Sequence, residues 1–144
     1  GTSAGAQMIW GIPWDETLKW LIDIGEKTYA EIASDSTSWG NYINNSFTYY
    51  TNTSKSTATK ASNSNIIIPS GAYEGTNANN IFDLAGNMSE WTLESYILKA
   101  NYGRTYRSGF FSGNGYQVTA SYRYYHTPNF IDNDIGLRCS LFIK

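Results

Sequence analysis

Residues that build catalytic and metal centres are scarce in this sequence of 144 residues, which has one cysteine, Cys139, and one histidine, His126. One cysteine excludes a disulfide within the chain and a cluster of thiolate ligands. One histidine excludes a metal site built from several imidazoles. The commonest catalytic sets are therefore excluded, and we expect no metal site and no cofactor. A pair of carboxylates could in principle perform acid/base chemistry, but we interpret them as turn caps and surface residues and so expect no catalytic residues; they are Asp83, Glu90, Glu94, Asp132 and Asp134.

Charge and long apolar runs are also scarce. Charged residues make up 15% of the chain and the net charge is -2, so no long-range field attracts nucleic acid or an anionic membrane. The longest aliphatic run, residues 66–68, is far shorter than the roughly 20 apolar residues of a membrane-spanning helix. We expect no nucleic-acid partner and no membrane insertion, and the length predicts a single domain over residues 1–144.

Aromatic residues, in contrast, reach 16% of the chain, and Asn, Ser and Thr together supply nearly a third. This composition predicts much strand and loop and little helix. A helix is predicted over residues 13–25, where Pro13 and Gly25 are start and stop signals, and a weaker helix over residues 26–33. The apolar face of the first helix consists of Trp14, Leu18, Leu21 and Ile22.

Polar residues dominate residues 35–80. We interpret this region as ordered loop anchored by Trp39, Phe47 and residues 66–68, because a long structureless segment is uncommon within a compact domain. Together with the strands below, it predicts an α+β fold with one or two helices, antiparallel strands and long ordered loops.

Strand patterns follow in the second half of the chain. A last strand over residues 134–144 alternates between apolar and other residues, so its apolar set, with Cys139, is predicted to face the core. That set is Ile135, Leu137, Cys139, Leu141 and Ile143. Further antiparallel strands are predicted over residues 90–98, 104–111 and 119–126.

The last 44 residues almost completely lack five residue types. Lys, Glu, Gln, Met and Trp occur 19 times in residues 1–100, but only twice, as Gln117 and Lys144, in residues 101–144. In their place stand Tyr and Phe interleaved with Ser, Asn and Gly, a composition typical of antibody-like binding loops. The alternative is that these aromatic residues are ordinary members of a half-buried sheet.

The segment NIFDLAGNMSEWT, residues 80–92, followed by GRTYRSGFF, ASYRYYHTP and DIGLRC, resembles the C-terminal part of formylglycine-generating-enzyme-type domains, a branch of the C-type lectin fold. Upstream, GIPWDETLKWLIDIG and SWGNYINNSF are similar to a helix opening and a Trp-Gly-Asn loop of this family. The resemblance spans residues 10–144. It implies a C-type lectin-like fold whose first strands and first helix precede Gly1.

The same resemblance implies that residues 80–92 form a rigid base. In this base Leu84 and Trp91 are expected in the core, and Asp83, Asn87 or Glu90 are expected to hold turns.

Enzymes of this family use a cysteine pair or a histidine cluster, and calcium-dependent lectins use Glu-Pro-Asn or Gln-Pro-Asp motifs; none of these sets occurs here. The chain is more similar to a non-enzymatic branch, the variable proteins of diversity-generating retroelements in phages and gut bacteria. In these proteins, adenines of Asn codons are randomised in the last strands. Such codons reach Phe, Tyr, His, Asp, Ser, Ile and Val, but not the five types that residues 101–144 lack.

This resemblance implies a display protein and not an enzyme, located in a phage virion tail or on a bacterial cell surface. Residues 101–140 would form a variable surface that recognises a protein or glycan on a host or neighbouring cell. Two alternatives stay open, a degenerate formylglycine-generating-type enzyme that uses a carboxylate, and an adhesion module without variability. The contact residues implied by position are Tyr106, Ser108, Phe110, Phe111, Ser112, Asn114, Tyr116, Tyr122, Tyr124, Tyr125, His126, Thr127, Asn129, Phe130 and Ile131.

Overall fold

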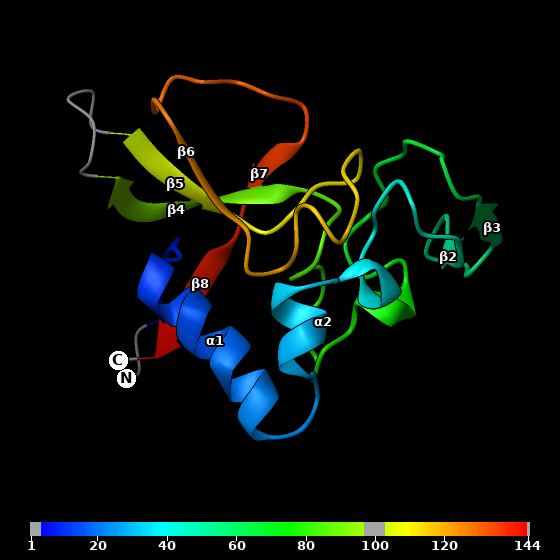
Figure 1. Ribbon diagram of the computed structural model, residues 1–144, viewed down its shortest axis with the longest axis horizontal. Helices are drawn as coiled ribbons and strands as arrows, with labels where there is room; N and C mark the ends of the chain where they lie inside the picture. The colour runs from blue at the N-terminus through cyan, green and yellow to red at the C-terminus, as the bar shows by residue number, and fades with distance from the viewer. Residues whose placement is uncertain (1–3, 97–102, 144) are drawn as a thin grey trace.

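The computed structural model describes residues 4–96 and 103–143. Figure 1 shows two helices on one side of a four-stranded sheet and a two-stranded hairpin at the far end of the molecule. This arrangement confirms the predicted α+β fold. In chain order the elements are β1 Ala4–Met8, α1 Gly11–Asp23, α2 Tyr29–Ala33, η1 Thr37–Trp39, β2 Phe47–Tyr50, β3 Thr57–Lys60, η2 Glu74–Thr76, β4 Ser89–Tyr96, β5 Gly103–Arg107, β6 Arg123–His126, β7 Ile135–Leu137 and β8 Cys139–Ile143.

The helix predicted over residues 13–25 is α1, whose apolar face packs into the core through Trp14, Leu18 and Leu21. Ile22, the fourth predicted member, is partly buried against the same core. α1 begins before Pro13 and not at it. Proline is tolerated there because the N–H groups of the first helical turn have no partner within the helix.

The second helix is shorter than predicted and begins at Tyr29. Its start is fixed by a capping box, in which the Thr28 hydroxyl accepts a hydrogen bond from the Glu31 N–H at 3.2 Å and the Glu31 carboxylate accepts one from the Thr28 N–H at 2.8 Å. Two otherwise unpaired backbone donors are thereby satisfied.

The polar region over residues 35–80 is ordered, as predicted, and contains the antiparallel hairpin β2–β3. Phe47 and Ile68 form a small core with Ala72 beneath this hairpin, and Trp39 belongs to the main core. Ile67 is exposed. The anchors predicted for this region are therefore confirmed at Trp39, Phe47 and Ile68.

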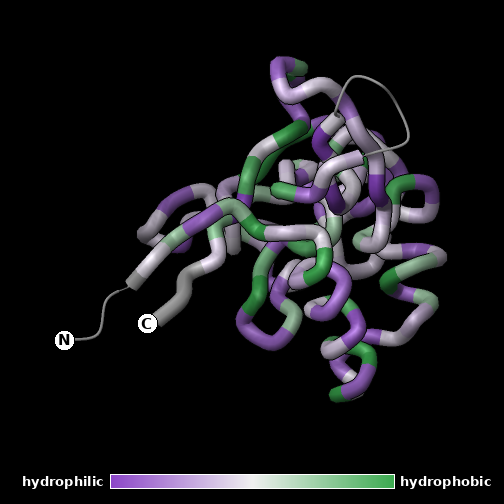
Figure 2. Tube along the Cα trace, turned by 90° about the vertical axis from the view of Figure 1, so that its left-hand side faces the viewer, coloured by the Kyte–Doolittle hydropathy of each residue, from purple (hydrophilic) through white to green (hydrophobic). Residues whose placement is uncertain are grey.

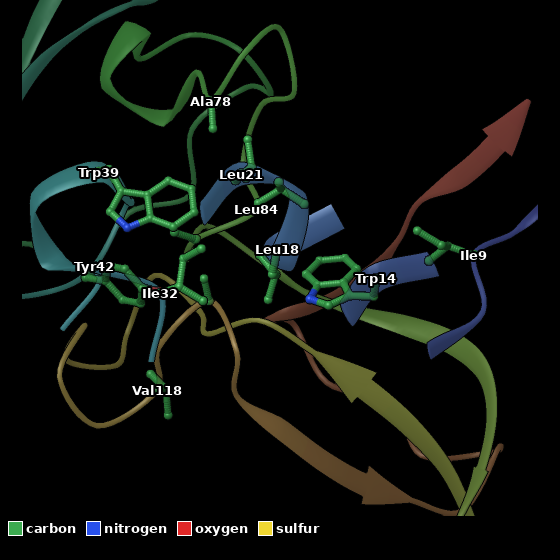
Figure 3. Packing of buried hydrophobic residues seen from close by; sticks show 12 residues of the cluster. Ile9, Trp14, Leu18, Leu21, Ile32, Trp39, Tyr42, Ala78, Leu84 and Val118 are labelled. Atoms are coloured by element: carbon green, nitrogen blue, oxygen red, sulfur yellow. The ribbon is translucent and has the colours of Figure 1, made fainter. Parts of the chain in front are cut away.

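The main core lies between α1, α2 and the rigid base. Figure 3 shows Trp14, Leu18 and Leu21 of α1 in one cluster with Trp39 and Leu84. The expectation that Leu84 is a core residue is confirmed. Trp91 is only half-buried and lies outside this cluster, so its predicted place in the core is wrong.

The four-stranded sheet has the order β6-β5-β4-β7. Strands β4, β5 and β6 overlap the three segments predicted as strands, and their pairings are antiparallel. β4 and β5 each begin one residue before the predicted segment, β5 and β6 are shorter than predicted, and residues 97–98 of the first segment lie outside the described residues. β7 pairs with β4 in parallel, because the chain crosses from β6 at one edge of the sheet to β7 at the other (Figure 1).

The C-terminal strand is divided at Arg138, contrary to prediction. β7 belongs to the four-stranded sheet, whereas β8 pairs with β1, and Figure 2 shows β1 and β8 side by side, extending away from the body of the molecule. Because the chain passes from one sheet to the other at this point, the alternating apolar residues of 134–144 do not all face the same core. Leu137 and Cys139 are exposed, and the side chains of residues 141–143 lie outside the described part of the chain.

Candidate functional site

One face of the four-stranded sheet carries a row of large side chains that crosses all four strands. Leu137 of β7 lies opposite Trp91 of β4, which lies opposite Tyr106 of β5. Tyr106 in turn lies opposite Tyr124 of β6. Residues directly opposite one another on adjacent strands point to the same face. We call this row, together with Tyr122, the outer aromatic face.

The rings of the outer aromatic face are in contact. Tyr124 is exposed, whereas Trp91, Tyr106 and Tyr122 are half-buried, and Tyr122 also packs against the main core. Trp91 meets Tyr106 edge to face at a centroid distance of 5.3 Å, and the Tyr106 and Tyr124 centroids are 5.8 Å apart. The Tyr122 and Tyr124 rings are parallel with centroids 6.1 Å apart. Leu137 and Tyr124 are 61% and 47% exposed. Such a surface offers large, rigid contact area.

Burial and the neighbouring Tyr122 and Tyr124 raise the pKa of Tyr106 to about 12. Burial and the neighbouring Tyr124 also raise the pKa of Tyr122. Both hydroxyls are therefore protonated at neutral pH, and each can donate one hydrogen bond to a ligand.

The opposite face of the sheet is buried and polar. Arg107 forms an ion pair with Asp15 of α1, and Arg123 binds the other oxygen of the same carboxylate at 2.6 Å. Burial lowers the pKa of Arg107, and the charge of Asp15 opposes this effect. The Thr92 hydroxyl donates to the Thr105 carbonyl at 2.9 Å. These contacts attach the strands of the outer aromatic face to one another and to α1.

The rigid base expected at residues 80–92 is present. The Asp83 carboxylate accepts a hydrogen bond from the Gly71 N–H at 3.1 Å, and Glu90 forms an ion pair with Arg138 at 2.7 Å. Asp83 and Asn87 both have left-handed backbone conformations, with φ of 59° and 63°. Their side chains are buried, and the Asn87 side-chain amide donates to the Ile68 carbonyl at 3.0 Å and accepts from the Ile68 N–H at 3.2 Å. Both residues thus form turns whose side chains bind neighbouring loops, as expected.

The predicted contact residues are spread over more than one surface. Tyr106, Tyr122 and Tyr124 belong to the outer aromatic face, and Tyr116, Asn129 and Ile131 are exposed in the loops before and after β6. The half-buried members are Phe110, Ser112, Asn114, Tyr125, His126, Thr127 and Phe130.

Some of the half-buried residues form ring pairs at the edge of the sheet. Tyr125 stacks on Tyr96 with centroids 3.7 Å apart, and His126 stacks on Phe130 at 3.6 Å. The Nδ1 atom of His126 accepts a hydrogen bond from the Thr127 N–H at 3.0 Å. These pairs position the start of the loop between β6 and β7.

Two predicted contact residues are part of the scaffold instead. Ser108 is fully buried, and its hydroxyl donates to the Leu84 carbonyl at 3.0 Å and accepts from the Gly86 N–H at 3.2 Å. Phe111 is 6% exposed, and its N–H donates to the Asn87 carbonyl. Both residues follow β5, where the chain turns back over the rigid base, so neither contributes to the accessible surface.

Reasoning from the sequence missed Trp91 and Leu137 as members of the outer aromatic face. In the sequence, Trp91 is expected in the core and Leu137 belongs to an alternating apolar set, and only the pairing of β4 with β5 and β7 places them beside Tyr106. The sequence shows Asp132 and Asp134 only as candidate carboxylates and does not relate them to Tyr106, whose pKa their charges help to raise.

His126 and Cys139 lie on different sheets, on β6 and β8. Within residues 4–96 and 103–143, no three His, Cys, Asp or Glu side chains are grouped so that they could hold a metal ion. In the same ranges, no helix is long and apolar enough to cross a bilayer.

The comparisons with known proteins agree with this fold. The Sulfatase-modifying factor enzyme 1-like domain matches residues 24–141, which confirms the resemblance to formylglycine-generating-enzyme-type domains. No curated protein matches the sequence.

Among solved structures, the chain is similar to "Crystal Structure of CarF" with a TM-score of 0.60 at 20% identity, a likeness that concerns the fold. The match covers 95% of this chain and 46% of that chain, so the chain spans about half the length of this relative. Because the family match extends over most of its residues, this chain belongs to the Sulfatase-modifying factor enzyme 1-like domain family.

Proposed function

We propose that this chain is a ligand-binding display protein, and not an enzyme, whose outer aromatic face recognises a protein or glycan on a cell surface. In this proposal it is a variable protein of a diversity-generating retroelement, carried by a phage tail or a bacterial surface. The observation that carries the proposal is the row of Trp91, Tyr106 and Tyr124 across the sheet, in which two half-buried rings lead to the exposed Tyr124.

The division of the sheet into two faces supports this proposal. Tyr106 and its neighbours Thr105 and Arg107 alternate between the outer face and the buried face. A change at Tyr106 therefore replaces a ligand contact without changing the ion pair of Arg107 beneath it. Sites on strands of a packed scaffold can vary in this way while the fold is kept.

The residue types of the face also fit adenine-directed variation. Tyr106, Tyr122 and Tyr124 are of a type that randomised Asn codons reach, whereas Trp91 is not and precedes residues 101–144. We infer a face with a constant half on β4 and a variable half on β5 and β6. The constant aromatic ring would supply affinity for any ligand, and the variable rings would select among ligands.

The test is the nucleotide sequence around the coding region. The proposal predicts a second, imperfect copy of the segment for residues 101–140 beside a reverse transcriptase gene, with differences confined to adenines of the copy. Absence of a copy, or mismatches at all four bases, would favour the adhesion module without variability. Tight stoichiometric binding of copper or iron by the purified protein would favour the degenerate enzyme.

A further inference from the structure

Two carboxylates lie in the loop that leads into β7, the strand that contributes Leu137 to the outer aromatic face. Asp132 and Asp134 belong to the loop that joins β6 to β7. The Asp134 carbonyl accepts a hydrogen bond from the Ser89 N–H at 2.8 Å, which attaches this loop to the first residue of β4. The two carboxylates are therefore held near the strand that carries Trp91.

The strand register places Asp134 at the end of β7 that leads to the outer aromatic face: it directly precedes Ile135, which lies opposite Ser89, and Leu137 follows opposite Trp91. Besides burial and its tyrosine neighbours, the charges of Asp134 and Asp132 contribute to the raised pKa of Tyr106. Burial, followed by the charge of Asp132, raises the pKa of Asp134. The two carboxylates thus add negative charge to the surface beside the phenol rings.

Neither Asp132 nor Asp134 takes part in any of the ion pairs found within residues 4–96 and 103–143. The Asp132 carboxylate accepts a hydrogen bond from the Asn133 N–H at 2.7 Å, but this donor carries no net charge. Two neighbouring negative charges without a counter-ion repel each other, and this repulsion disfavours the state in which both are ionised. The arginines of the sheet region are engaged elsewhere, Arg107 and Arg123 with Asp15, Arg138 with Glu90, and Arg104 with the Leu93 carbonyl and the Ser95 hydroxyl.

A guanidinium group is chemically complementary to both the aromatic rings and the carboxylates. It is planar and stacks on aromatic rings, whose faces attract cations. It also donates two parallel hydrogen bonds to one carboxylate. We propose that the outer aromatic face binds an arginine side chain of a partner protein, which lies against Tyr106, Tyr122 and Tyr124 and pairs with Asp132 or Asp134. This inference rests on the proposed function and names the chemistry of its ligand.

The test compares two small ligands that differ in charge but hardly in shape, Nα-acetyl-arginine methylamide and its citrulline analogue. Each is titrated into the full chain while the backbone amide signals are followed by NMR. The arginine compound is expected to shift the signals of Tyr106, Tyr122, Tyr124 and residues 132–134. The citrulline compound is expected to bind at least about fivefold more weakly, because it lacks the charge.

Variants separate this site from general attraction to acidic groups. The Asp132→Asn/Asp134→Asn double variant should weaken arginine binding about fivefold and abolish its salt dependence, with an unchanged amide spectrum elsewhere. The control is Asp23→Asn, an exposed carboxylate on α1 that pairs with Lys19, which should leave binding unchanged. Equal losses in both variants would overturn the inference.

Two other results would also overturn it. If arginine and citrulline compounds bind equally, the face has no preference for a cation. If calcium chloride shifts the same signals and displaces the arginine compound, the carboxylates form a metal site. Either result leaves the proposed display function in place, because that function is decided separately by the template copy in the nucleotide sequence.

Discussion

Arg107 and Asp15 form an ion pair between β5 and α1, directly beneath the outer aromatic face. The Arg107 side chain is 2% exposed, whereas that of Asp15 is 47% exposed. Replacing Asp15 by Ala removes the direct partner of the buried guanidinium and leaves only the charge of Glu94 nearby. We expect the free energy of unfolding to fall by about 2 kcal/mol, since the half-exposed partner reduces the usual cost of breaking a buried pair.

Urea denaturation measures this change, and Asp23→Ala is the matched control. Asp23 pairs with Lys19 on the exposed surface of α1, so its loss should cost less than about 0.5 kcal/mol. Equal effects of the two substitutions would show that the pair beneath the sheet is not a structural support.

Ser108 and Tyr124 are both reachable by randomised Asn codons, but only Tyr124 lies on the accessible surface. Ser108→Tyr places a large ring in a fully buried position with φ of 71°, and we expect it to destabilise the fold by about 3 kcal/mol or more. The reciprocal change, Tyr124→Ser, should cost less than about 1 kcal/mol. Thermal unfolding of both variants checks the contrast, and a tolerated tyrosine at position 108 would contradict it.

Glu31 is expected to make stability depend on pH. Hydrogen bonds from the backbone and hydroxyl of Thr28 lower the pKa of Glu31 from its ordinary 4.5. The unfolded chain then holds the proton more tightly, so this stabilising contribution is present above pH 4.5 and is lost as pH falls through the lowered pKa. Between pH 7 and pH 3, this contribution should lower the free energy of unfolding of the wild type by about 1 kcal/mol or less. Urea denaturation at each pH should show a smaller decrease in the Glu31→Gln variant. An identical pH profile in both proteins would count against the capping box.

Cys139 should react with a maleimide reagent in the native protein, because its side chain is exposed on β8. Mass spectrometry after brief labelling without denaturant measures this directly. The alternating pattern of the sequence predicts the reverse, a thiol protected until the protein unfolds. If labelling requires denaturant, Cys139 is buried in the native protein, and the division of the strand at Arg138 is contradicted.

Local patterns predicted the elements whose partners lie nearby in the sequence. Trp14, Leu18 and Leu21 recur at helical spacing, and this periodicity alone places α1 against the core. The family motifs predicted the rigid base, although the side chains of Asp83 and Asn87 bind residues far away in the sequence, at Gly71 and Ile68. The helix and the motif of residues 80–92 could be predicted because each is recognised from a pattern within one continuous segment of the sequence.

Features that depend on strand pairing could not be predicted. Trp91 resembles a core residue until β4 is paired with β5, which turns it outward beside Tyr106. Leu137 and Cys139 follow one alternation, but the chain leaves one sheet for another between them. Ser108 has the composition of a contact residue, and only its bonds to Leu84 and Gly86 show that it is scaffold.

The central claim is that the outer aromatic face varies while the scaffold beneath it stays constant. Saturation mutagenesis of residues 103–131, with proteolytic stability as the readout, tests it most directly. We expect most substitutions at Tyr106, Tyr122 and Tyr124 to cost less than about 1 kcal/mol, and most at Arg107 and Ser108 to cost more than about 2 kcal/mol. Equal sensitivity of the outer and the buried positions would contradict the account.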